Sequence, residues 1–159
     1  MELVFATHNA GKLQEAQEIL VKFARVLSLD DIHFTAEIEE TETTLQGNAL
    51  LKARAVWAAT GKNCFSDDTG LEVNALNGAP GVYSARFAGP QANPQDNMTK
   101  LLAQLEGVED RTAQFRTALA LIWEGEEFLF DGVVKGRISR TNGTGCLKCC
   151  NYARQVSCC

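Results

Sequence analysis

Residues 3–24 read LVFATHNAGKLQEAQEILVKFA, and this stretch decides the fold. The apolar run at its start has the length of a strand, a polar loop follows, and Asn9 is suited to cap a helix. Apolar residues then recur at three- and four-residue spacing. This spacing predicts a helix over about residues 11–24. The side chains expected on its buried stripe are Leu13, Ala16, Leu20 and Phe23, with Ile19 beside them.

The rest of the chain continues the alternation of strands and helices. Further strands are expected at 25–29, 63–66 and 71–76, and helices at 45–60 and from Pro94 until Gly107. Residues 30–44 are polar and acidic, which is typical of an irregular connection, and residues 67–70 predict a sharp acidic corner between two strands. Alternating patterns at 114–123 and 126–138 predict a long antiparallel pair. The early alternation of strands and helices and the later antiparallel pair together predict an α/β fold, a mixed β-sheet with flanking helices.

Length and charge exclude several classes of protein. The 159 residues form one domain by the usual length prior, and 45% hydrophobic residues suffice for a core. We expect no membrane partner and a cytoplasmic location, because no apolar run approaches the roughly 20 residues needed to span a bilayer and no leader precedes Leu3. Twenty acidic against 15 basic residues give a net charge of −5, so polymeric nucleic acid is not expected as a partner. A small anion such as a nucleotide remains possible.

The loop of residues 7–12 is a candidate phosphate cradle. A strand that leads through a loop into a helix N-terminus aims unpaired backbone N–H groups and the positive end of the helix dipole at one point. Lys12 adds a full positive charge there. The spacing of a Walker loop is absent, and an ordinary turn with a solvated lysine is the alternative interpretation.

The acidic residues form a second candidate site. Adjacent carboxylates at the end of a buried strand repel each other and are costly to desolvate, so a cation or hydrogen-bond donors should lie nearby. Magnesium suits such hard oxygen ligands, whereas the alternative is a simple turn that Asp67 begins and Asp68 caps. Asn48 and Lys52 lie one turn apart on the expected second helix and form a third candidate. The acidic set is Glu39, Glu40, Glu42, Asp67 and Asp68.

Four motifs, in order along about the first 140 residues, resemble the inosine triphosphate pyrophosphatase family. They are Thr7-His8-Asn9-Ala10-Gly11-Lys12 with Glu15; Gly47-Asn48-Ala49 through Lys52-Ala53; Ser66-Asp67-Asp68-Thr69-Gly70-Leu71-Glu72-Val73; and Gly78-Ala79-Pro80-Gly81-Val82-Tyr83-Ser84-Ala85-Arg86. The resemblance implies an elongated mixed sheet with two lobes around a central cleft and a homodimer. It also implies magnesium-dependent hydrolysis of ITP, dITP and XTP to the monophosphate and pyrophosphate.

The resemblance also implies roles for single residues. Thr7, His8, Asn9, Ala10, Gly11 and Lys12 would hold the triphosphate, with Lys52 near it and Thr69 helping to orient the assembly. Asp68 would be the catalytic base and a magnesium ligand, and Glu40 would complete the metal site. This assignment agrees with the candidates found from the residues, because attack of water on phosphorus needs neutralised phosphate charge and a deprotonated water.

The resemblance ends near residue 145. The family's later Phe-Gly-Tyr-Asp and Ser-His-Arg motifs are absent, and residues 146–159 instead contain Cys146, Cys149, Cys150, Cys158 and Cys159. We therefore expect a pyrophosphatase domain at 1–145, incomplete on its C-terminal side, followed by a Cys-rich tail produced by a frame change or a sequence error. Free thiols and a zinc site are the other interpretations of the tail.

Two functions of other classes stay open on the sequence. One is a nucleotide-binding remnant that binds phosphates without catalysis, since the segment that would recognise the base is missing. The other is an interaction or zinc-dependent module that acts through the tail.

Overall fold

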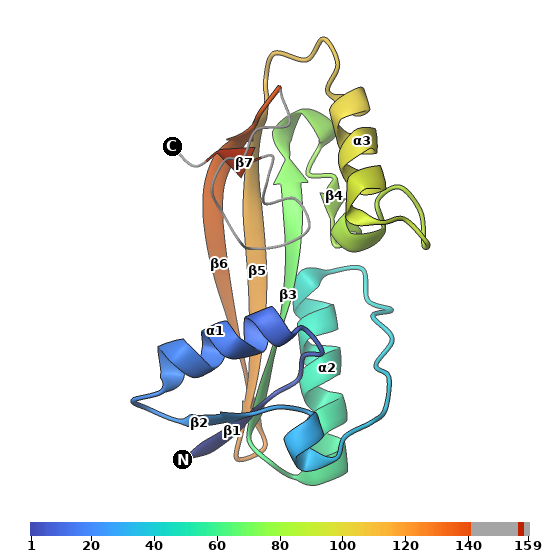
Figure 1. The fold of residues 1–159 in the computed structure, drawn as a ribbon. Helices are drawn as coiled ribbons and strands as arrows, with labels where there is room; N and C mark the ends of the chain where they lie inside the picture. The colour runs from blue at the N-terminus through green and yellow to red at the C-terminus, as the bar shows by residue number, and fades with distance from the viewer. Residues whose placement is uncertain (141–155, 158–159) are drawn as a thin grey trace. The chain divides into compact units, whose positions relative to one another are not determined.

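The computed structural model describes residues 1–140 and the backbone of residues 156 and 157 (Figure 1). The predicted boundary at residue 145 and the other predictions for the Cys-rich tail lie outside the described residues. The strands are β1 (Glu2–Phe5), β2 (Arg25–Leu27), β3 (Cys64–Val73), β4 (Pro80–Gly81), β5 (Thr112–Trp123), β6 (Glu126–Ile138) and β7 (Val156–Ser157). The helices are α1 (Ala10–Leu20), α2 (Leu45–Thr60) and α3 (Pro94–Gln104), with short 3₁₀ turns at Asp30–Ile32, Asn74–Leu76 and Ser84–Arg86.

The described strands form one mixed sheet in the order β2-β1-β3-β5-β6-β7, and β4 pairs with β3. Strand β1 is parallel to both β2 and β3, with Val4 opposite Leu27 and Cys64. The connection from β5 to β6 is the tight turn at Glu124-Gly125, where both residues have positive φ angles, as a two-residue hairpin requires. The predicted mixed α/β sheet with flanking helices is confirmed. No helix in the described part of the chain combines the length and the apolar character needed to cross a membrane.

The chain divides into two compact units, each with its own core. Unit 1 comprises residues 1–68 and 118–131, and unit 2 comprises residues 69–117 and the chain from Gly132 on. In unit 1, apolar residues of α1 pack against buried residues that include Phe5, Val26 and Phe65. In unit 2, the core includes Leu71 of β3 and Leu101 of α3. The predicted cleft between two lobes stays a prediction.

Capping contacts confirm both predicted ends of α2 and the predicted start of α3, whereas α3 ends at Gln104, before the expected Gly107. Thr44 caps α2 by accepting a hydrogen bond from the backbone N–H of Gly47, and Gly61 ends the helix with a left-handed φ of 62°. Asn93 and Asp96 form a capping box around Pro94 at the start of α3. These local signals predicted the two helix starts correctly because capping chemistry depends on neighbours in the sequence.

The predicted acidic corner at residues 67–70 is wrong, because β3 runs without interruption from Cys64 to Val73. Successive side chains of a strand point to opposite faces of the sheet. Asp67 and Asp68 therefore diverge, and each finds a hydrogen-bond donor on its own side: Lys12 for the first and Asn48 for the second. Because both carboxylates have hydrogen-bond donors within the protein, the strand can continue without a turn that would expose them to water.

The prediction that Ile19 and Phe23 join the buried stripe of the first helix is wrong. Ile19 and Phe23 are 74% and 72% exposed, although Leu13 and Leu20 pack against the core as expected. Helix α1 ends at Leu20, so Phe23 leaves the helical stripe, and Ile19 lies one position off it. On β5 buried and less buried positions alternate over most of the strand, and Ala118, Ala120 and Ile122 on one face are almost fully buried.

Candidate functional site

Successive side chains of β3 point to opposite faces of the sheet, so the candidate site residues of this strand lie partly on the α1 side and partly on the α2 side. Cys64 and Ser66 point towards α2, where their side chains donate hydrogen bonds to the carbonyls of Ala53 and Ala49. Phe65 points to the other face and stacks on Phe5. By the same alternation Asp67 lies on the α1 side and Asp68 on the α2 side. Figure 1 shows α2 running alongside β3.

The phosphate-loop candidate has the predicted conformation. Asn9 caps α1 by accepting a hydrogen bond of 3.1 Å from the backbone N–H of Lys12, and the Asn9 N–H donates to Thr7 Oγ1 at 3.2 Å. His8, Ala10 and Gly11 are exposed. Since the first N–H groups of a helix have no partner within the helix, this exposed first turn offers donors to an anion.

Lys12 is the link from this loop to β3. Its Nζ lies 2.6 Å from Asp67 Oδ2, and the two side chains are 32% and 12% exposed. The ion pair holds an ammonium group at the N-terminus of α1, where the helix dipole also favours an anion. The sequence identified both residues as candidates but did not predict that they pair.

Asp68 is held from the other side by α2. Asn48 Nδ2 donates a hydrogen bond of 3.1 Å to Asp68 Oδ2, and Asn48 itself is completely buried. The predicted catalytic residue therefore has a fixed amide donor on one carboxylate oxygen. The sequence placed Asn48 next to Lys52 on a helix face but gave it no role, because nothing local to residue 48 indicates a contact 20 positions away.

Lys52 and Glu40 form the second ion pair of unit 1. Lys52 Nζ lies 2.5 Å from Glu40 Oε1, with side chains 15% and 33% exposed. The structure thus brings together a predicted phosphate-binding residue and a predicted metal ligand. Lys52 reaches Glu40 across the acidic connection that precedes α2.

Thr69 begins unit 2, where its hydroxyl lies 2.9 Å from that of Thr117 on β5. On the same strand, Glu72 accepts hydrogen bonds from Gln114 at 2.6 Å and Arg116 at 3.0 Å. These contacts join β3 to β5 on both faces of the sheet: Thr69 shares the face of Leu71 and Val73, which enter the core, and Glu72 lies on the opposite face. Sequence reasoning did not single out Gln114 or Arg116.

The donor set of unit 1 is compatible with magnesium. Residues 1–140 contain no group of three or more His, Cys, Asp or Glu side chains arranged around one point. Magnesium does not require such a group, since it is typically held by one or two carboxylates together with waters and substrate phosphates. Asp68 and Glu40 supply hard carboxylate oxygens of that kind.

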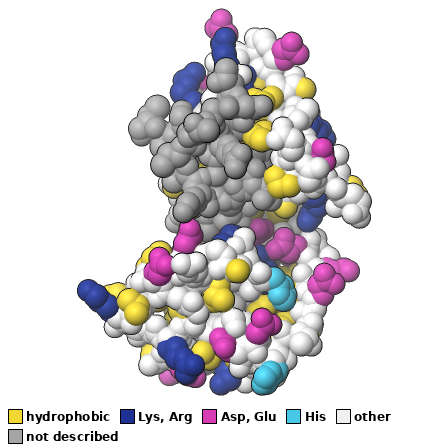
Figure 2. Space-filling model, viewed as in Figure 1, with side chains coloured by type: hydrophobic (Ala, Val, Ile, Leu, Met, Phe, Trp, Pro, Cys, Tyr) yellow, Lys and Arg dark blue, Asp and Glu magenta, His cyan; other side chains and the backbone are white. Residues whose placement is uncertain are grey.

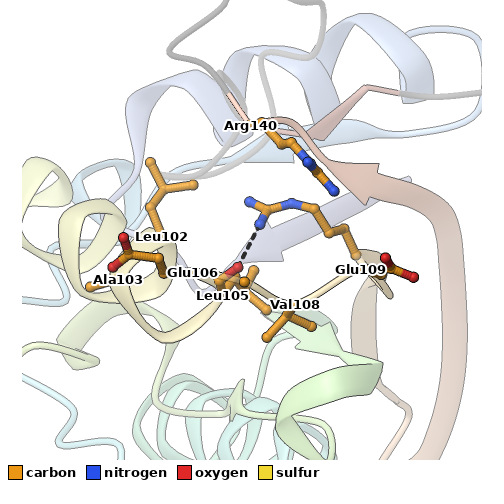
Figure 3. A pocket seen from close by; sticks show the side chains of 9 residues that line it. Leu102, Ala103, Leu105, Glu106, Val108, Glu109 and Arg140 are labelled. Carbon is orange, nitrogen blue, oxygen red and sulfur yellow. Dashed lines mark hydrogen bonds between the residues drawn. The ribbon is translucent and has the colours of Figure 1, made fainter.

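A pocket of about 510 Å³ in unit 2 contains none of the predicted site residues (Figure 3). Leu102 of α3 and Glu106, just after that helix, line it together with Arg140 and the buried Arg111. The Arg111 guanidinium donates to the carbonyls of Leu105, Ile138 and Ser139, and burial lowers its pKa. We interpret Arg111 as a structural residue that links the segment after α3 to the end of β6 through these hydrogen bonds.

The distribution of charge fits a local anion site better than a nucleic-acid surface. On the face in view, Lys and Arg side chains lie among acidic ones rather than in a continuous patch (Figure 2). Arg54 pairs with Glu127 through two hydrogen bonds of 2.6 and 2.7 Å, and its guanidinium lowers the pKa of that carboxyl.

Comparison with known proteins identifies the family. The model of the Ham1 family matches residues 3–147. The chain belongs to the Ham1 family. It is 50% identical over 149 residues to a dITP/XTP pyrophosphatase of Flavobacterium johnsoniae, which covers 91% of this chain and 78% of the relative. This confirms the resemblance found in the four motifs.

Solved structures agree with this assignment. The Staphylococcus aureus Ham1 protein superposes with a TM-score of 0.83 at 36% identity, covering 92% of this chain and 77% of that one. A nucleoside-triphosphatase, dITP/XTP pyrophosphatase, of Mycobacterium abscessus gives a TM-score of 0.82 at 37% identity, covering 99% and 84%. The fold of this Ham1-family chain is therefore the fold of its relatives.

Proposed function

We infer that this chain hydrolyses nonstandard purine nucleoside triphosphates, namely ITP, dITP and XTP, to the monophosphate and pyrophosphate. The observation that carries this inference is the 50% identity, over 91% of the chain, to a relative named dITP/XTP pyrophosphatase. A nucleotide-binding protein without activity is not favoured, because the relatives are named as enzymes. Such an enzyme removes nonstandard purine nucleotides from the nucleotide pool.

In the proposed reaction, water attacks the α-phosphorus and pyrophosphate leaves. Asp68 accepts the proton of the attacking water, which requires a carboxylate in a fixed orientation. The hydrogen bond from the buried Asn48 supports this role, because it fixes one oxygen of Asp68. The chain supplies no covalent intermediate in this scheme, so positioning and charge carry the catalysis.

The triphosphate would lie at the exposed first turn of α1. The residues proposed to bind it are Thr7, His8, Asn9, Ala10, Gly11 and Lys12, with the exposed backbone N–H groups of His8, Ala10 and Gly11 and the Lys12 ammonium as donors. Lys52 would provide a second ammonium group, and Thr69 a hydroxyl. The support for these roles is the exposed helix N-terminus and the partial burial of both lysines, which strengthens their interaction with phosphate.

We propose magnesium as the cofactor, held by the carboxylates of Asp68 and Glu40. When bound, it would neutralise charge on the triphosphate. In the structure Glu40 pairs with Lys52, and Asp68 with Asn48, so both carboxylates are oriented by contacts from α2. These contacts restrict the positions of both carboxylates in the absence of a metal ion.

We also propose that two copies of the chain associate and that the enzyme acts in the cytoplasm, where its substrates would arise. Apolar side chains of β6 support association, since Phe128 and Phe130 in unit 1 are 40% and 54% exposed. The two residues are two positions apart on β6 and therefore share one face of that strand. Light scattering coupled to size exclusion tests the dimer directly.

The experiment that tests the function is a pyrophosphate-release assay with magnesium. ITP, dITP and XTP are compared with ATP and GTP, and the Asp68→Asn variant serves as the background control. We expect the first three nucleotides to be hydrolysed preferentially by the wild-type chain. Equal or absent release from all five would contradict the proposal.

A further inference from the structure

The Gly47-Asn48 pair of the second motif lies where the acidic connection meets α2. A Cβ atom added at Gly47 would lie 2.8 Å from the Cβ of Glu42 and 2.9 Å from Thr44 Oγ1. Real Cβ atoms do not approach other atoms so closely, so any other residue at this position would push the connection away from the helix. Glycine therefore permits the contact between Glu42 and α2.

Asn48 uses both ends of its amide to tie two segments together. Its Oδ1 accepts a hydrogen bond of 3.0 Å from the backbone N–H of Glu42, and its Nδ2 donates to Asp68 Oδ2 at 3.1 Å. The N–H of Glu42 can only donate, and this fixes which end of the amide faces it. The donor end must then face Asp68. Because Asn48 is 0% exposed, water does not compete for either bond.

We propose that Asn48, seated by Gly47, is a positioning residue that sets the orientation of the Asp68 carboxylate and holds the acidic connection against β3. This inference rests on the proposed function and extends it from Asp68 to Gly47 and Asn48, the residues that hold Asp68 and the acidic connection in place. Glu40 lies two residues before the clamped backbone of Glu42, so the same latch restricts both proposed magnesium ligands. Asn48 acts through Asp68 and does not itself touch the substrate.

Asn97 provides a matched comparison within the same chain. It is also 0% exposed, its Oδ1 accepts from the backbone N–H of Ala88 at 2.7 Å, and its Nδ2 donates at 2.9 Å. The acceptor of that last bond is the carbonyl of Ala85 instead of a carboxylate. Both asparagines are thus buried amides that clamp a loop, and only Asn48 reaches a proposed catalytic residue.

The test uses the full chain and the variants Asn48→Ala, Asn48→Asp, Gly47→Ala and Asn97→Ala. Turnover of dITP gives kcat and KM, hydrogen exchange of the peptide containing Glu42 reports the latch, and the melting temperature reports folding. Asn48→Asp keeps an oxygen for the Glu42 N–H but turns a carboxylate towards Asp68. It therefore separates the two halves of the clamp.

We expect Asn48→Asp to lower kcat by about 10- to 100-fold with little change in KM, while exchange at Glu42 stays slow. Asn48→Ala should lower kcat and also accelerate hydrogen exchange at Glu42. Gly47→Ala should accelerate the exchange at Glu42. Asn97→Ala should lower the melting temperature as much as Asn48→Ala does, with kcat within about twofold of wild type, the scatter expected where only folding is affected.

Two results would overturn the inference. A wild-type kcat in Asn48→Asp would remove the role at Asp68, and unchanged exchange of Glu42 in Asn48→Ala would remove the latch. Failure of the proposed function has a different signature, since the wild-type chain would then hydrolyse none of the nucleotides. In that case the role of Asn48 in catalysis is rejected together with the proposed function. The hydrogen exchange of Glu42 still tests whether Asn48 holds the acidic connection in place.

Discussion

Lys12 and Asp67, 55 positions apart in the sequence, meet in an ion pair of 2.6 Å. The pair joins the first turn of α1 to the middle of β3, so the proposed phosphate loop is anchored to the strand that carries Asp68. The Lys12 side chain is 32% exposed and that of Asp67 12%, so the pair lies between the surface and the buried part of unit 1. A bound phosphate would therefore meet an ammonium group whose position is already restricted.

Replacing Lys12 should weaken substrate binding more than it weakens the fold. We expect Lys12→Met to raise KM for dITP by about 10- to 100-fold, the value of one charge-assisted contact to phosphate. Because Lys12 is partly exposed, water screens the pair, and the loss of unfolding free energy should stay near 1 kcal/mol or below, about the value of a surface ion pair. Steady-state kinetics and chemical denaturation measure the two effects.

Lys62→Met is the matched control for this variant. Lys62 is an exposed lysine of unit 1 in the connection after α2, and the same charge is removed. Its KM should equal that of the wild type. If Lys62→Met and Lys12→Met raise KM equally, the effect is one of net charge and the assignment of Lys12 to the phosphate is wrong.

Asp68→Asn should abolish hydrolysis while the protein remains folded. The substitution preserves shape, and the new amide can turn its oxygen towards Asn48 Nδ2, so the buried hydrogen bond survives. It removes the proton acceptor, which is typically worth about 10²- to 10⁴-fold in rate. Pyrophosphate release measures the loss of hydrolysis, and the melting temperature shows whether the protein remains folded. Turnover near the wild-type level would exclude Asp68 as the base.

The ion pair between Lys52 and Glu40 predicts two separable defects. Glu40→Gln should raise the magnesium concentration required for half-maximal turnover, because the carboxylate is lost. Lys52→Met should instead raise KM for dITP, because a phosphate partner is lost. Magnesium titrations at saturating nucleotide, and nucleotide titrations at saturating magnesium, distinguish the two. A shift of both variants in the same titration would show that the pair is structural.

Much of the fold could be predicted from local sequence, as α2 illustrates. Thr44 and Gly61 specify its ends by contacts within four residues, and its observed bounds are those predicted. The antiparallel pair of β5 and β6 was also predicted from a local pattern, the alternation of apolar residues along each strand. Positions of this kind depend on backbone chemistry that the neighbouring residues supply.

The contacts of the site could not be predicted in the same way. Adjacent aspartates suggested a turn, yet β3 continues because Lys12 and Asn48 lie on opposite faces of the sheet to receive them. Those partners are 55 and 20 residues away, and only the packing of both helices on the strand brings them there. Sequence indicated which residues matter chemically, while the fold determined which of them pair.

Cys64 provides a prediction about pH that involves no site residue. Burial raises the pKa of its thiol from 9.0 to about 11, so at pH 8 only about one thiol in a thousand is the reactive thiolate. Iodoacetamide should therefore label Cys64 very slowly in the native chain and rapidly in denaturant, as peptide mass spectrometry can follow. Rapid native labelling would contradict the burial of this residue.

The same shift of the Cys64 pKa makes stability depend on pH. Above pH 9 the thiol ionises in the unfolded chain but keeps its proton in the folded one, so the unfolded state binds fewer protons and stability falls as pH rises. The fall should continue until about pH 11, with a slope of at most about 1.4 kcal/mol per pH unit. Cys64→Ala removes this contribution. Denaturation curves of the two chains at pH 8 to 10.5 should therefore converge with rising pH, and parallel curves would show that the thiol ionises equally in both states.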